Sequence, residues 1–136
     1  MKRTASAHWE GDLKTGKGNV STQSTILNKT QYSFKTRFED GAGTNPEELL
    51  AAAHAGCFTM AVSAGLGQAG FIPTALDTVA TLTLEGLDVT GIHLSIKGSV
   101  PNITAAQFSE FVKGAEKGCI ISKALSVPIT SDAELV

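Results

Sequence analysis

The stretch that decides the fold is TNPEELLAAAHAGCF, residues 44–58. It starts as helices start, because Asn45 is a good N-cap, Pro46 suits the first helical position and a glutamate follows three residues after the cap. Two carboxylates in the first turn also favour the helix dipole. Apolar side chains then occupy nearly every side as far as Gly65 or Gly67. The stretch therefore predicts a long central helix that is buried on most sides.

The segments before this helix are rich in strand-forming residues. Three of them have strand-like composition, namely residues 4–10, 18–27 and 32–38. In the last segment, alternation places Arg37 on the face opposite Tyr32. We therefore expect three strands ahead of the helix, with Arg37 standing in the third.

The segments after the helix predict a hairpin, a second helix and a last strand. Residues 77–85 and 89–100 alternate between apolar and polar, with a short connection between them. A capping box at Thr104 opens an amphipathic helix that ends at Gly118. A short helical turn and a strand complete the chain, over residues 119–125 and 127–135. The order βββ-α-ββ-α-β predicts an α+β fold in a single domain over residues 1–136.

Composition limits the classes of function. The chain has 136 residues and a net charge of −2, and a field this weak gives no sign of nucleic-acid or acidic-membrane binding. Residues 49–66 are borderline in length for a membrane span, but a buried core helix is the better interpretation. No apolar leader follows the charged N-terminus, so we expect a cytoplasmic protein in which thiols are kept reduced.

Cys57 and Cys119 are the first candidates for chemistry. Cys57 lies in the middle of the central helix, where a free cysteine packs as a small hydrophobe unless something activates it. His54 lies three residues earlier and is either a general base for this thiol or a packed core histidine. Cys119 follows a helix end, a position that can stabilise a thiolate. The two cysteines are inert core residues, free thiols or a redox pair.

Arg37 and Glu47 are the charged residues of most interest. From composition alone, Arg37 is a solvated strand residue and Glu47 contributes to the start of a helix. The glycines of residues 65–70 resemble a dinucleotide-binding fingerprint, but they end a helix instead of opening one. That context excludes the dinucleotide interpretation.

Several motifs together resemble the OsmC family, which comprises osmotically inducible protein C and the organic hydroperoxide resistance proteins. They are TNPEEL at residues 44–49, AAHAGCF at 52–58 and EKGC at 116–119. The segments AHWEG at 7–11 and YSFKTRFE at 32–39 favour the OsmC branch. The similarity extends over essentially the whole chain. In one departure, Ile120 stands where many relatives have a proline after the second cysteine.

This resemblance implies a thiol-dependent peroxidase that reduces organic hydroperoxides, and hydrogen peroxide less well. Cys57 falls at the family's peroxidatic position and Cys119 at its resolving position, so a sulfenic acid on Cys57 would be resolved to a disulfide. Arg37 and Glu47 match the charged pair that tunes the reactive thiol. The family uses no bound cofactor or metal and is recycled by an external dithiol, with lipoyl-type dithiols expected here. A non-catalytic redox sensor and a protein that binds small apolar ligands are the alternatives.

The spacing of Glu47 and Cys57 adds a geometric argument. Ten residues on one straight helix amount to a rise of about 15 Å, too far for Glu47 to assist its own Cys57 easily. Either the helix bends or a second subunit supplies Arg37 and Glu47. We therefore expect an active site built at a dimer interface, which agrees with the intertwined homodimer of the family.

Overall fold

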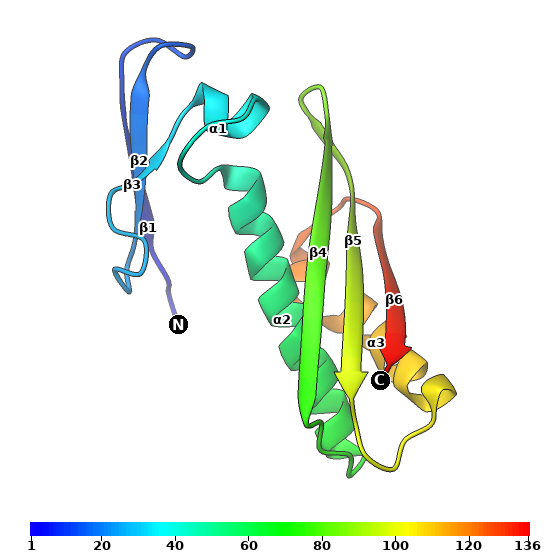
Figure 1. Cartoon of the computed structure of the whole chain (residues 1–136). Helices are drawn as coiled ribbons and strands as arrows, with labels where there is room; N and C mark the ends of the chain where they lie inside the picture. Colours follow the sequence, from blue (N-terminus) through cyan, green and yellow to red (C-terminus); the bar gives the residue numbers. More distant parts are fainter. The chain divides into compact units, whose positions relative to one another are not determined.

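The computed structural model describes every residue from Met1 to Val136 (Figure 1). The chain divides into two compact units, Met1–Leu49 and Leu50–Val136. Each unit contains one three-stranded sheet. The strand and helix content confirms the expected α+β class.

The first unit is built on an antiparallel sheet in the order β1-β2-β3. Its strands are β1 (Ala5–Glu10), β2 (Lys17–Thr22) and β3 (Thr30–Tyr32). Gly18 in β2 pairs with Trp9 on one side and with Tyr32 on the other. Because Gly18 has no side chain, the two rings meet above it with their centroids 5.5 Å apart. A Cβ at this position would lie 2.5 Å from the Trp9 ring, so the aromatic pair depends on the glycine.

The predicted strand over residues 32–38 is wrong. It ends as β3 at Tyr32, and helix α1 (Phe34–Phe38) follows. Ser33 caps this helix, because its hydroxyl accepts the backbone N–H of Thr36 while the Thr36 hydroxyl accepts that of Ser33. This reciprocal pair outweighs the alternation that favoured a strand. Arg37 consequently stands on a helix. The neighbouring strand is also shorter than expected, because β2 ends at Thr22 instead of continuing to Leu27.

Helix α2 (Pro46–Gln68) begins where the sequence predicts and ends one residue beyond the second expected glycine. The side-chain oxygen of Asn45 accepts the backbone N–H of Glu48 at 2.7 Å, as an N-cap does. The carboxylate of Glu48 accepts the hydroxyl of Thr44, also at 2.7 Å, and makes no contact with the Asn45 backbone. The cap is therefore present, and the glutamate three residues after it is bonded to a threonine hydroxyl instead of to the backbone of the cap residue.

In the second unit, the predicted hairpin, amphipathic helix, short helical turn and last strand are all present. Its mixed sheet has the order β4-β5-β6, with β4 antiparallel and β6 parallel to β5. Helix α3 starts at the expected capping box of Thr104 and Gln107. The bounds are β4 (Ala75–Glu85), β5 (Asp88–Ser99), α3 (Ala105–Gly118), α4 (Ile120–Ala124) and β6 (Ile129–Leu135).

The core of the second unit lies between the sheet and the two long helices. Figure 1 shows α2 and α3 on the same side of β4, β5 and β6. The fully buried side chains come from both helices and the central strand: Phe58, Val62 and Leu66 of α2, Ile92, Leu94 and Ile96 of β5, and Phe108 and Val112 of α3. These residues form one continuous apolar cluster.

A single chain buries α2 on one side only. His54, Phe58, Val62 and Leu66 form its buried row, whereas Met60 is 74% exposed. By length and composition this helix would also be able to cross a membrane. Within a single chain, 22% of its most apolar 18-residue stretch is buried. Burial within one chain is thus narrower than the sequence predicts, and a second apolar row remains uncovered.

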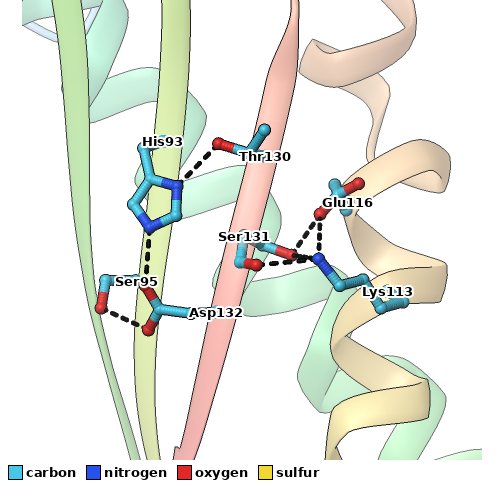
Figure 2. Close-up of polar contacts among 7 residues, drawn as sticks. All are labelled: His93, Ser95, Lys113, Glu116, Thr130, Ser131 and Asp132. Carbon is cyan, nitrogen blue, oxygen red and sulfur yellow. Dashed lines mark hydrogen bonds and ion pairs between the residues drawn. The ribbon is translucent and has the colours of Figure 1, made fainter.

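Two polar clusters hold β6 in place, one on each face of the sheet (Figure 2). On the outer face, the imidazole of His93 in β5 contacts Thr130 at 2.7 Å and the Asp132 carboxylate at 2.6 Å. On the inner face, Glu116 of α3 accepts hydrogen bonds from Lys113 at 2.9 Å and from the Ser131 hydroxyl. Lys113 also donates to the backbone carbonyl of Ser131 at 2.8 Å. The inner cluster therefore fixes α3 against the edge strand.

A Gly98→Ala substitution should destabilise the second unit. A Cβ on Gly98 would lie 2.4 Å from the ring of Phe108, which is fully buried and has no free direction to move. We expect the free energy of unfolding to fall by about 1–3 kcal/mol, measured by urea denaturation at fixed protein concentration. Gly114→Ala is the control, because Gly114 is exposed on α3 and a Cβ there meets nothing. It should be neutral or stabilising by up to about 1 kcal/mol. Equal stability of Gly98→Ala and wild type would contradict this packing.

A Glu116→Gln substitution should lower the free energy of unfolding, and the loss should be largest at neutral pH. Burial alone would raise the pKa of Glu116, but the hydrogen bonds from Ser131 and Lys113 outweigh burial and lower it. A carboxyl whose pKa is lowered by folding stabilises the protein above about pH 4.3, and this contribution disappears as the pH falls.

We expect Glu116→Gln to reduce the free energy of unfolding by about 1–2 kcal/mol at pH 7. The difference from wild type should shrink steadily below about pH 4.3, as measured by denaturant titrations across pH. Glu110→Gln on the same helix is the control, because Glu110 is exposed. A difference that does not depend on pH would show that the charge of Glu116 is not what stabilises the contact.

Candidate active site

The two cysteines belong to the second unit and differ in burial. Cys57 lies in the middle of α2, half-buried and packed against the core cluster. Cys119 lies where α3 ends and α4 begins, and only 2% of its surface is exposed. Both are free thiols. Cys119 is therefore shielded from solvent, whereas Cys57 retains part of its exposure.

Cys119 is both the C-cap of α3 and the N-cap of α4. Its backbone N–H donates to Ala115 at the end of α3, and its sulfur accepts the backbone N–H of Ser122 at 3.2 Å. Its backbone is extended, with ψ of 146°. A following proline would impose this same conformation, yet the residue present is Ile120. Ile120 takes the first helical position, where the N–H of any residue lacks a helical partner. The chain therefore reaches the extended geometry without the proline.

The His54 imidazole makes its hydrogen bond with Ser122, which lies beside Cys119. It makes none with the Cys57 thiol, for which the spacing had suggested it as a general base. The imidazole is fully buried, and Nε2 lies 2.7 Å from the hydroxyl of Ser122. The Cys119 thiol donates to the same hydroxyl at 3.1 Å. Burial lowers the pKa of His54, so the imidazole is neutral near pH 7. Nδ1 is buried and has no hydrogen-bond partner.

Arg37 and Glu47 meet in the first unit. Arg37 on α1 donates through Nε to Glu47 Oε1 in the first turn of α2, at 2.8 Å. The Glu47 side chain is mostly buried, and its second oxygen, Oε2, has no partner. The Arg37 guanidinium also lies 5.3 Å from the centre of the Phe38 ring. The predicted charged pair is thus formed, with one carboxylate oxygen left unsatisfied.

An apolar hollow of about 240 Å³ lies beside Arg37 in the first unit. Four of its seven lining residues are aromatic, and the cationic side chain of Arg37 also lines it. The lining residues are Trp9, Leu13, Tyr32, Ser33, Phe34, Arg37 and Phe38. Such a hollow suits a small apolar group attached to a polar or anionic end.

The structure thus brings Arg37 to Glu47, and His54 to Cys119 through Ser122. Sequence reasoning did not identify Ser122. Its position three residues after Cys119 is a local signal, because a side chain at a helix start accepts the N–H found three residues later. The contact between Ser122 and His54 spans 68 residues of sequence and leaves no local signal. No group of three or more His, Cys, Asp or Glu side chains gathers as a metal site would.

Comparisons with known proteins agree on one family. A model of the family described as OsmC-like protein matches residues 39–134. The protein called Peroxiredoxin OsmC from Escherichia coli strain K12 is 49% identical over 139 aligned residues, covering 99% of this chain and 97% of that protein. The protein of the same name from Shigella flexneri matches equally well.

Solved structures share the fold at lower sequence identity. An OsmC-like protein of unknown function from Vibrio cholerae aligns with a TM-score of 0.75 at 14% identity, covering 98% of this chain and 99% of that one. The organic hydroperoxide resistance protein OhrB of Bacillus subtilis aligns with a TM-score of 0.66 at 21% identity, covering 98% of each chain. The α+β architecture is therefore the architecture of these proteins.

Proposed function

The chain belongs to the OsmC family of peroxidases, and from that premise we propose that it reduces organic hydroperoxides with Cys57 as the attacking thiol and Cys119 as the resolving thiol. Identity of 49% to proteins named Peroxiredoxin OsmC, over nearly the full length of both chains, supports a peroxidase. The observation that carries the assignment to these residues is that both cysteines are free thiols, one partly exposed and one buried at a helix junction.

The proposed cycle has three steps. The Cys57 thiolate attacks the terminal oxygen of the hydroperoxide, the one that bears hydrogen, and the O–O bond breaks. Cys57 becomes a sulfenic acid, and the alkoxide takes up the proton that the Cys57 thiol had released and leaves as the alcohol. Cys119 then attacks the Cys57 sulfur, forming the disulfide and releasing water. An external dithiol reduces this disulfide by exchange and is itself oxidised. Hydrogen peroxide would be a poorer substrate than an organic hydroperoxide.

Arg37 and Glu47 are proposed to stabilise the charge of the first step. A guanidinium offers several N–H donors in a fixed plane, and Arg37 uses Nε on Glu47. The remaining donors are thus available for the thiolate or for the peroxide oxygens as negative charge develops on them. Glu47 holds the plane of the guanidinium in place.

The apolar hollow beside Arg37 supports an organic substrate. Its wall is mostly aromatic, and a hollow of about 240 Å³ accepts an alkyl or aryl group rather than a peroxide alone. The substrate's organic group would fill the hollow while its peroxide end points to the guanidinium.

We also propose that the active site is shared between two subunits of an intertwined homodimer. Helix α2 runs unbroken from Pro46 to Gln68, so Glu47 and Cys57 of one chain stay about 15 Å apart along it. The uncovered row of α2 supports a second subunit, because it consists of Met60 and small residues that permit close approach: Ala53, Gly56, Ala64 and Gly67. Arg37 and Glu47 of each chain would then serve Cys57 of the partner.

The remaining parts of the proposal concern context. Residues 1–136 would act as one OsmC-like domain in the cytoplasm, without nucleic-acid or membrane partners. Thiol chemistry needs no prosthetic group or metal, because the sulfur atoms carry the electrons and a dithiol, expected to be of the lipoyl type, supplies them.

One equivalent of an organic hydroperoxide should remove both thiols of the reduced protein. We expect the intact mass to fall by two hydrogens and the free-thiol count to reach zero, because the disulfide replaces two S–H groups. Cys119→Ser is the matched variant and should stop with one added oxygen on Cys57. If wild type gains an oxygen and keeps one thiol, the first step is supported but Cys119 does not resolve it. If no reaction occurs, the peroxidase assignment fails and a ligand-binding protein becomes the better explanation.

Mixing two inactive variants tests the shared site. A dimer of one Cys57→Ser chain and one Arg37→Ala chain would contain one complete site, with the cysteine from one chain and the arginine from the other. Equal mixing after subunit exchange should give about a quarter of wild-type activity with cumene hydroperoxide and a dithiol. Each variant alone is the control. Subunit exchange proven by mass, with no gain in activity, would contradict the shared site.

A further inference from the structure

A buried hydrogen-bond chain links an imidazole to the Cys119 thiol. Three elements supply its members: His54 from α2, Ser122 from α4, and Cys119 from the junction of α3 and α4. The steps are 2.7 Å from Nε2 to the serine hydroxyl and 3.1 Å from that hydroxyl to the sulfur. All three side chains are buried, so bulk solvent does not compete for these contacts.

The single proton of the Ser122 hydroxyl permits two arrangements of this chain. In the first, the Cys119 thiol donates to Ser122, which donates to Nε2 of a neutral His54. In the second, His54 has gained a proton at Nε2 and donates to Ser122, which donates to the Cys119 thiolate. One proton shift along each hydrogen bond converts the first arrangement into the second. The backbone N–H of Ser122 already points at the sulfur, at 3.2 Å, and stabilises the thiolate.

We infer that His54, acting through Ser122, is the base that ionises Cys119 for its attack on the oxidised Cys57. This inference rests on the proposed function, in which Cys119 is the resolving thiol. The serine carries the proton and is unchanged at the end. His54 is a positioning residue in this scheme, because it reaches the sulfur only through the hydroxyl.

The step balances in atoms and charge. The proton of Cys119 passes to Ser122 while the serine proton passes to His54 Nε2. The thiolate attacks the sulfenic sulfur of Cys57, an S–S bond forms and the S–O bond breaks. The leaving hydroxide takes up the proton that His54 holds and departs as water. Sulfur oxidation is supplied by the peroxide of the preceding step.

The surroundings of His54 suit a base that holds a proton only briefly. The imidazole faces Ser122 and, through it, the Cys119 thiol, and Cys57 lies three residues along the same helix. Burial is the sole cause of the lowered pKa of His54, and no carboxylate or cation contributes to it. The neutral imidazole is therefore ready to accept a proton, and its charged form releases that proton easily.

Single-turnover kinetics separate this role from mere packing. The reduced protein is mixed with cumene hydroperoxide, quenched with acid and analysed by intact mass, so that oxidation of Cys57 and closure of the disulfide are timed separately. Ser122→Ala removes the hydroxyl, and His54→Gln keeps a hydrogen-bonding group without a base. We expect both variants to oxidise Cys57 within about twofold of wild type and to close the disulfide about 10- to 100-fold more slowly at pH 7.

The pH profile provides a readout that a structural role would not move. Wild-type closure should be flat from neutral pH upward and should fall only on the acid side, where His54 is protonated. Closure in both variants should instead rise with pH over the same range, because hydroxide from solution must then remove the thiol proton in place of His54. Thr59→Val is the control, because the half-buried Thr59 hydroxyl on α2 is bonded to Thr78 and takes no part in the hydrogen-bond chain of His54, Ser122 and Cys119.

The outcomes separate the proton relay, from Cys119 through Ser122 to His54, from the peroxidase cycle in which it takes part. Closure as fast as wild type in both variants, or slowed by a factor that does not change with pH, would overturn the relay. A wild-type protein in which Cys57 never gains oxygen would instead overturn the proposed function. Thermal unfolding of each variant, with His54→Asn added if His54→Gln does not fold, ensures that slow closure is measured on folded protein.

Discussion

The apolar cluster that the buried row of α2 forms with residues of β5 and α3 is the contact on which the rest of the second unit depends. Phe58, Val62 and Leu66 are fully buried in this cluster. Burying a large apolar side chain contributes about 1.5–3 kcal/mol, more than any surface polar contact of this chain. This contact places Cys57 beside the core and His54 inside it, because both share the helix.

Cys119 depends on a second constraint, the fixing of α3 to the edge strand β6. Phe108 and Val112 bury one side of α3, and the contacts of Lys113 and Glu116 with Ser131 hold its last turns. Figure 2 shows this cluster on the face opposite His93 and Asp132. The helix end that carries Cys119 is thereby fixed relative to the sheet. A fixed position favours the resolving role that we propose for Cys119, because a flexible thiol would lose the geometry of attack.

The parts of the fold predicted from sequence are those decided by local signals. Asn45 and Thr104 mark the two long helices, and both caps form. Helix α1 was missed because alternation in residues 32–38 was given more weight than the Ser33–Thr36 cap. The four candidate site residues were found from a family resemblance, and their roles stay predictions. The contact of Ser122 with His54 could not be predicted from the sequence, because the two residues are distant in sequence and only tertiary packing brings them together.

Two buried side-chain atoms lack a hydrogen-bond partner, Oε2 of Glu47 and Nδ1 of His54. Each such atom costs about 1–3 kcal/mol, so a protein keeps few of them without a reason. Both belong to residues to which we assign chemistry on independent grounds: the ion pair of Arg37 and the hydrogen bond to Ser122. An acceptor at Nδ1 would stabilise the imidazolium and raise the pKa of His54, whereas burial without one keeps the imidazole neutral. The unsatisfied Nδ1 therefore accords with the proposed role, in which His54 holds the proton of Cys119 only briefly.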